Sequence, residues 1–152
     1  MKHILLTAAA IAAIVTTAAA QAPNAASLIH ERQTHYKQMG AALKGINDQL
    51  HGDSPSIDVI RQHSRTISGF AVQLLRWFPR GTGPESGVRT RALPAIWTDN
   101  ATFQRDGAAL LVAARALDAA ARRGDLAAVR AAMPQVGHAC GNCHDSFRAP
   151  EH

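Results

Sequence analysis

The fold is decided near the end of the chain by LAAVRAAMPQVGHACGNCHDSF, residues 126–147. Its apolar residues recur at alternating steps of three and four, a spacing that places them on one face of an α-helix. That face carries Leu126, Val129, Met133, Val136, Cys140, Cys143 and Phe147. The stretch therefore predicts an amphipathic helix with both cysteines on its buried face, and Pro134 predicts a kink within it.

Three earlier segments repeat this periodicity, and turn signals separate them. Their apolar faces run from Ile29 to Leu50, from Ile57 to Phe78 and from Ile96 to Ala121. Gly52-Asp53-Ser54-Pro55 separates the first two faces, and Arg123-Gly124-Asp125 joins the third to residues 126–147. Strand patterns are almost absent. The sequence predicts an all-α fold, an antiparallel up-down-up-down four-helix bundle.

A 16-residue loop from Pro79 to Pro94 links the second and third segments and is longer than a bundle needs. In the predicted topology this loop lies at the same end as the start of the first helix and the end of the fourth. Tyr36 and His144 should therefore face one region of the interior, which makes this end the candidate functional end.

Residues 1–20 have the pattern of a secretory signal rather than of the bundle. Met1-Lys2-His3 is a basic start, Ile4 to Val15 is apolar but too short to span a bilayer, and Ala18-Ala19-Ala20 provides an A-x-A cleavage site. We expect cleavage after Ala20 and export to the periplasm. Residues 21–152 then form one domain that is not attached to a membrane.

Composition excludes several classes of function. The formal net charge is +5, but no basic run is interleaved with aromatic residues, so nucleic acid is not an expected partner. The 2 cysteines lie in one short motif and cannot build a disulfide framework. No nucleophile, base and orienting group form a recognisable set, so the chain is not expected to be an enzyme.

The motif Cys140-Gly141-Asn142-Cys143-His144 has the C-x-x-C-H spacing of haem attachment. Two thiols add to the two vinyl groups of one porphyrin, and the next imidazole becomes the axial ligand of the iron. Cys140 and His144 are an i, i+4 pair on one helical face, as this chemistry requires. The sequence therefore predicts one covalent haem c per chain, with His144 on the iron.

Two other interpretations of the motif stay open. A C-x-x-C pair can be a thiol switch or half of a zinc site. The first usually follows a strand and the second needs further ligands; the sequence offers neither a strand nor a third cysteine.

Arg32 also lies on the apolar face of the first segment, where an unpaired charge is costly. Haem propionates would be its partner, unless the first turn frays and Arg32 reaches solvent.

The chain resembles the cytochrome c′ family, the class II c-type cytochromes, over roughly residues 27–148. The resemblance rests on Arg32-Gln33, on residues 78–82 (FPRGT), on residues 90–97 (TRALPAIW) and on Val136-Gly137 with the C-x-x-C-H motif and Phe147-Arg148. It implies that Arg32 and Gln33 hold the haem propionates, and that Arg148 lies beside the proximal face. It also implies a homodimer formed through the first two helices.

The resemblance places Tyr36 on the distal side of the iron. Family members with methionine at this position have six-coordinate, low-spin iron, whereas members with a non-ligating residue have five-coordinate iron that binds nitric oxide and carbon monoxide. Phenol is a poor ligand unless it is ionised, so we expect five-coordinate iron, gas binding and electron transfer with redox partner proteins. The alternative is a low-spin electron carrier with Met39 as sixth ligand. His35 is expected to be a surface histidine.

Overall fold

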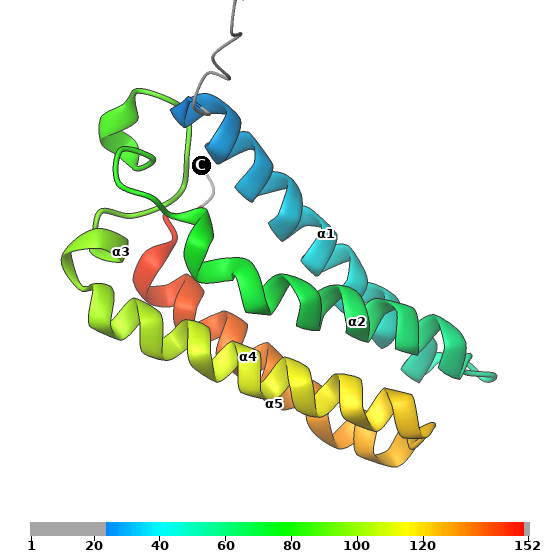
Figure 1. Cartoon of the computed structure of the whole chain (residues 1–152). Helices are drawn as coiled ribbons and strands as arrows, with labels where there is room; N and C mark the ends of the chain where they lie inside the picture. The colour runs from blue at the N-terminus through cyan, green and yellow to red at the C-terminus, as the bar shows by residue number, and fades with distance from the viewer. Residues whose placement is uncertain (1–23, 151–152) are drawn as a thin grey trace, which may run out of the picture.

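The computed structural model describes residues 24–150, so the predicted signal segment lies outside the described part of the chain. Within it, four long helices run antiparallel and form the predicted four-helix bundle (Figure 1). They are α1 (Ala25–His51), α2 (Ile57–Gln73), α4 (Asn100–Arg123) and α5 (Leu126–Phe147). Three short helices lie between α2 and α4: the 3-10 helices η1 (Leu74–Trp77) and η2 (Pro84–Ser86), and α3 (Ala95–Thr98).

Two helix boundaries differ from the expected periodic faces. The second face continues beyond α2, but its last turn winds more tightly, as the 3-10 helix η1. The third face is interrupted at Asp99, whose backbone leaves the helical region and whose side chain accepts a hydrogen bond from the Thr102 amide at 3.4 Å. An aspartate that caps α4 in this way ends α3, so one predicted helix is two.

Local signals in the sequence set the other helix ends. Ser56 caps α2 by accepting from the Val59 amide, and Asp125 caps α5 by accepting from the Ala128 amide at 2.9 Å. Gly124 ends α4 with a φ of +73°, a left-handed conformation that favours glycine. The tight turn before the motif-bearing helix is therefore encoded locally. Helix α5 continues through Pro134 without a break.

The buried side chains follow the predicted apolar faces. On α1 and α5 they include Ile29, Met39, Ile46, Val129 and Val136. The core also contains a polar contact that the apolar faces did not predict. Ser64 of α2 donates to the buried Asp118 of α4 at 3.2 Å, and Arg122 forms an ion pair with the same carboxylate. Partners are thereby supplied for both polar groups, as burial requires.

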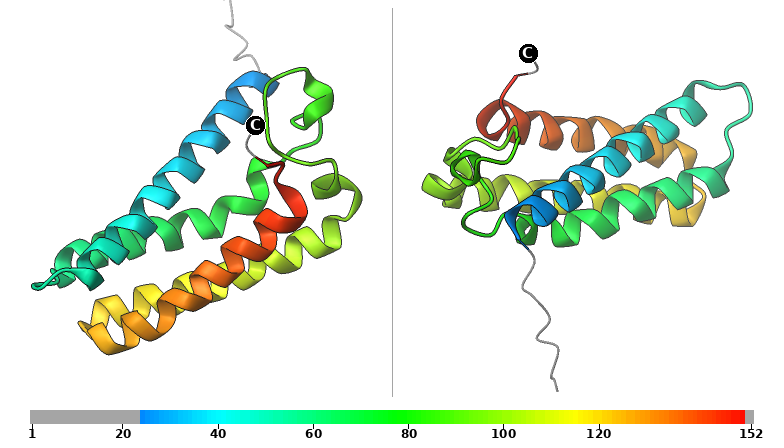
Figure 2. Two further views of the ribbon diagram at one scale, coloured as in Figure 1. Left: turned by 180° about the vertical axis from the view of Figure 1, so that it is seen from behind. Right: turned by 90° about the horizontal axis from the view of Figure 1, so that it is seen from above.

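Three of the four seams of the bundle are closed by packing. Helix α1 packs on α2, α2 packs on α4, and α4 packs on α5. Helices α1 and α5 instead diverge toward the end where α1 begins and α5 finishes, which two views show (Figures 1 and 2). The long loop and η2 lie across this end. The divergence leaves room inside the bundle at the end where the sequence predicts the site.

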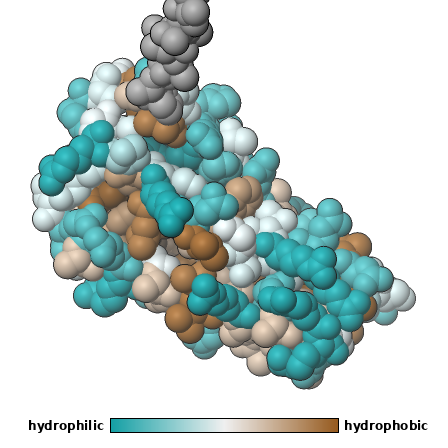
Figure 3. Space-filling model, in the orientation of Figure 1, coloured by the Kyte–Doolittle hydropathy of each residue, from teal (hydrophilic) through white to brown (hydrophobic). Residues whose placement is uncertain are grey.

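Hydrophobic side chains gather on one part of the outer surface, where the end of α2, the long loop and α4 meet (Figure 3). The opposite end of the bundle is mostly hydrophilic in the same view. Among the described residues, none of the helices combines the length and the apolar character that crossing a bilayer requires.

Two glycines on the α1–α2 pair provide a matched test of this packing. A Cβ at Gly69 would meet nothing within 4 Å, whereas a Cβ at Gly45 would lie 2.7 Å from Cδ2 of the His63 ring. We expect Gly69→Ala to stabilise the protein by about 0.5–1 kcal/mol through helix propensity. Gly45→Ala should gain less than this or lose stability, because the imidazole must move. Denaturant unfolding of the haem-loaded protein measures both, and equal gains would contradict the α1–α2 packing described.

Candidate haem-binding site

A cavity of about 520 Å³ occupies the end of the bundle where α1 and α5 diverge. Its volume lies in the range of about 300–1,000 Å³ that cofactor sites occupy. Every residue that the sequence analysis singled out for the site lines this cavity. These are Arg32, Gln33, Tyr36 and Met39 from α1, Cys140, Cys143 and His144 from α5, and Arg148 just beyond it. The structure therefore brings residues of α1 and residues of α5 together around one space.

The α5 wall presents the two thiols and the imidazole from consecutive turns of one helix. A short antiparallel pairing with the long loop fixes the end of this helix. The Leu93 amide donates to the Phe147 carbonyl at 3.0 Å, and the Ala149 amide donates to the Arg91 carbonyl at 2.8 Å. Arg91 Nε also donates to the Ala149 carbonyl at 2.7 Å. His144 thus lies close to the hydrogen bonds that join the long loop to the end of α5.

The protonation of these groups bears on the open interpretations of the motif. Burial raises the pKa of both thiols, that of Cys143 to about 11, and the Asp106 carboxylate contributes to the rise at Cys143. Since the thiolate is the nucleophile in disulfide exchange, these thiols are poorly suited to a redox switch. Burial, then Arg148 and Arg91, lowers the pKa of His144, which favours the neutral imidazole that binds iron.

Arg32 is buried, at 3% exposure, and its guanidinium holds the long loop. Its two terminal nitrogens donate to the Trp77 carbonyl at 3.3 Å, to the Thr82 hydroxyl at 3.2 Å and carbonyl at 2.9 Å, and to the Thr90 hydroxyl at 3.0 Å. It also lies 4.5 Å from the ring centroid of Phe78. All of these acceptors are neutral, so the positive charge remains available to an anion in the cavity that it lines.

Gln33 holds the same loop, because its Nε2 donates to the Arg89 carbonyl at 3.1 Å. The pair that the resemblance assigns to the propionates therefore also anchors residues 77–90. Sequence reasoning missed this second role, since no local pattern connects α1 with a loop about 50 positions away.

Tyr36 forms an aromatic wall with the residues that follow α2. Its ring meets Trp77 edge-on at 5.4 Å between centroids and lies 6.3 Å from Phe78. Burial raises the pKa of Tyr36, so the phenol is neutral at ordinary pH. Met39 lines the cavity one turn further along α1 and is 7% exposed.

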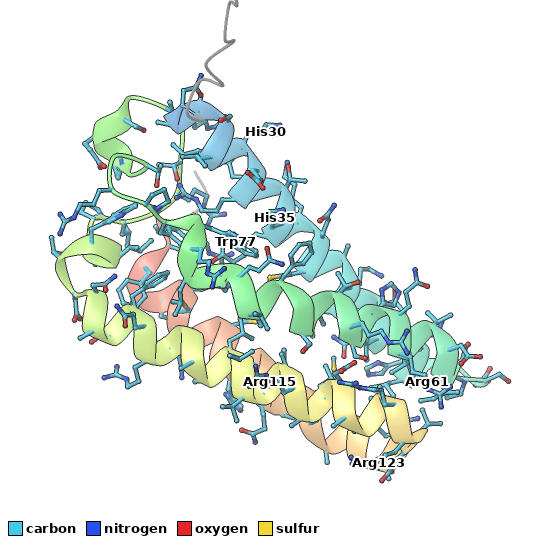
Figure 4. The ribbon with its side chains drawn as sticks, in the orientation of Figure 1. His30, His35, Arg61, Trp77, Arg115 and Arg123 are labelled. Atoms are coloured by element: carbon cyan, nitrogen blue, oxygen red, sulfur yellow. The ribbon has the colours of Figure 1, made fainter. Side chains whose placement is uncertain are left out.

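His35 is not the surface residue that was expected. Its side chain is 20% exposed and stacks on Phe70 at 4.8 Å and on Trp77 at 4.7 Å between ring centroids, outside the set of cavity-lining residues. Figure 4 shows His35 and Trp77 side by side between α1 and the end of α2. Phe70 of α2 and Trp77 of η1 explain the error, because the periodicity of α1 alone does not reveal them.

Two charged residues that line the cavity, Lys37 and Asp106, were missed by the sequence analysis. Asp106 follows Phe103 by three positions on α4 and therefore shares its face, which is the signal that could have identified it. Gly107 also lines the cavity, and a Cβ there would meet Leu75 Cδ2 at 2.6 Å, so a larger residue would have to displace the Leu75 side chain of η1.

The chemistry of the lining suits a haem. Aliphatic and aromatic side chains form most of the wall, and four basic residues face the same space: Arg32, Lys37, Arg91 and Arg148. A flat apolar ring that carries two carboxylates is complementary to such a lining. The α5 face supplies two thiols for the vinyl groups and one imidazole for the iron. Across residues 24–150, no three His, Cys, Asp or Glu side chains cluster as a metal site.

Comparisons with known proteins agree with this geometry. The family model described as Cytochrome C' matches residues 27–148. A cytochrome c′ of Rhodospirillum rubrum is 32% identical over 150 residues, which covers 98% of this chain and 99% of that protein. Two solved structures each cover 86% of this chain and 100% of their own. One is a cytochrome c′ with ligand-controlled dimer dissociation (TM-score 0.79, 25% identity), and the other is a nitric oxide complex of a mutant cytochrome c′ from Alcaligenes xylosoxidans (TM-score 0.76, 26% identity).

The hydrogen bonds from Arg32 predict that the stability of the loop depends on this side chain. Lysine keeps the charge but lacks the planar fork of donors, so Arg32→Lys leaves buried acceptors at Thr82 and Trp77 unpaired. We expect a loss of about 2–3 kcal/mol in the free energy of unfolding and faster amide exchange across residues 79–90. Arg115→Lys, at an exposed position on α4, is the matched control. Unchanged exchange in Arg32→Lys would show that the guanidinium does not hold the loop.

Proposed function

The chain belongs to the cytochrome c′ family, and from that premise we propose that it is a periplasmic haem protein with five-coordinate iron. The family binds covalently attached haem c. The proposed role is binding of diatomic gases, nitric oxide and carbon monoxide, together with transfer of single electrons to and from redox partner proteins. We propose that residues 1–20 direct export and are removed after Ala20.

The observation that carries the proposal is the half-buried, neutral phenol of Tyr36 in the α1 wall of the cavity. When bound, the haem supplies one-electron chemistry and an axial position at which a gas binds. On the α5 side, Cys140 and Cys143 hold the ring covalently and His144 supplies the fifth ligand. On the α1 side, a neutral phenol does not ligate iron and instead occupies space, so it leaves a crowded but open sixth position.

Similar proteins support gas binding and dimerisation. The Alcaligenes xylosoxidans mutant was solved as a nitric oxide complex, and another relative forms a dimer whose dissociation is controlled by ligand. We propose that this chain likewise forms a homodimer, through α1 and α2, and acts as a ligand-binding carrier rather than as an enzyme.

Met39 favours a second candidate, a six-coordinate low-spin electron carrier. Its thioether lies in the same cavity one turn from Tyr36, and methionine is a known axial ligand of haem iron. In this alternative the site is closed to gases, and electron transfer alone remains.

Absorption spectra separate the two candidates. We expect high-spin spectra in both the ferric and the ferrous state, and a shift of the ferrous bands by carbon monoxide, because no side chain fills the sixth position. Met39→Leu should leave the spectra unchanged. Low-spin spectra that become high-spin in Met39→Leu would establish Met39 as the ligand and overturn the five-coordinate proposal.

Tyr36 should control how fast gases reach the iron. We expect Tyr36→Ala to bind carbon monoxide faster than the parent, because the ring no longer crowds the open sixth position. Tyr36→Phe keeps the bulk and loses only the hydroxyl, so its rate should stay near that of the parent. Stopped-flow or flash photolysis of the ferrous protein measures both rates. An unchanged rate in Tyr36→Ala would show that the ring does not limit the access of carbon monoxide to the iron.

A further inference from the structure

Asp106 is the single acidic side chain among the described residues that line the haem cavity. It lies on α4, between Phe103 and Gly107, which line the same cavity. Its side chain is 14% exposed, so little of the carboxylate is in contact with water. A negative charge in such a place is costly unless it interacts with something, and the proposed gas and electron chemistry does not use it.

The nearby positive charge does little to neutralise Asp106. Arg105 is its ion-pair partner, with Nη2 3.6 Å from Oδ1, but the Arg105 side chain is 71% exposed. An exposed guanidinium at that separation is strongly screened by water. Arg32 lines the same cavity, but its terminal nitrogens form their hydrogen bonds with the loop and not with Asp106. The field of the carboxylate therefore extends into the cavity.

Asp106 shares its cavity with the residues proposed to hold the haem. Asp106 lines it from α4, and Cys143 and His144 line it from α5. A carboxylate in this position is therefore placed to act on a haem that Cys143 and His144 would hold.

A fixed negative charge near a redox centre stabilises the more positive of its two oxidation states. In a cavity of low effective dielectric the effect is several times larger than in water. We propose that Asp106 sets the reduction potential of this cytochrome by stabilising its ferric form. The step concerned is the gain of one electron by ferric iron, with no atom transferred. The inference rests on the proposed electron-transfer function and names the residue that tunes it.

This assignment implies a requirement for the electron donor. Lowering the potential makes the ferrous state, to which carbon monoxide binds, harder to reach. The redox partner must then be a donor of correspondingly low potential. The basic residues at the cavity act in the opposite direction, so the potential reflects a balance that Asp106 shifts toward the ferric form.

The test is spectroelectrochemical titration of the haem-loaded protein at pH 7. In Asp106→Asn we expect the ferrous-to-ferric ratio at a fixed applied potential to rise about tenfold, which is about 59 mV for a one-electron couple. Asp106→Glu should restore the low potential. Asp53→Asn makes the same charge change in the exposed turn after α1 and should leave the potential where it is. The Asp106→Asn shift should also persist at high salt, because buried charges are screened little.

Asp106→Ser provides a second neutral variant in case the amide disturbs the packing of α4. Unchanged potentials in both neutral variants, or a shift equal to that of Asp53→Asn, would overturn the inference. A parent protein that keeps covalent haem and a reversible couple leaves the proposed function standing in that event. Loss of the couple in the parent itself would instead reject the proposed function.

Discussion

The core of this bundle is incomplete at one end, and the rest of the architecture follows from that. Three seams close by packing, but α1 and α5 diverge and leave about 520 Å³ that the chain does not fill with its own side chains. Protein interiors are close-packed, so an apolar space of this size is unfavourable unless another group occupies it. A haem in this space would be part of the hydrophobic core as well as a cofactor, and the proposed covalent attachment through Cys140 and Cys143 would keep it there.

The long loop connects the two sides of this space. Arg32 and Gln33 hold its first part from α1, and residues 91–93 pair with the chain beyond α5. The helix that carries Tyr36 and the helix that carries His144 are thus joined through one loop although they pack little on each other. A buried guanidinium suits this position because it offers several donors in a rigid plane to loop carbonyls and hydroxyls. The length of the loop, unusual for a bundle, provides the reach from one helix to the other.

Much of this could be predicted from the sequence because the signals are local. Steps of three and four residues identified the apolar faces, the Arg123-Gly124-Asp125 turn marked a helix boundary, and the C-x-x-C-H spacing pointed to a helix face that lines the cavity. Topology then placed Arg32, Tyr36 and His144 at one end, where the structure has them. The errors concern contacts between distant segments. The loop partners of Arg32, the aromatic stack around His35 and the entry of Asp106 into the cavity all depend on tertiary packing that no periodicity within one helix reveals.

The arrangement separates three properties of the haem among three helices. Attachment and the fifth ligand are proposed to belong to α5, access to the sixth position to depend on Tyr36 of α1, and the potential to depend on Asp106 of α4. Because α1 and α5 are joined mainly through the loop, a change at Tyr36 need not disturb the thioether face. Asp106 acts through its field, which falls off with distance but needs no contact, so it can shift the potential without altering ligation. Such a bundle can acquire different gas affinities and different potentials by substitution at separate positions, while the motif on α5 stays the same.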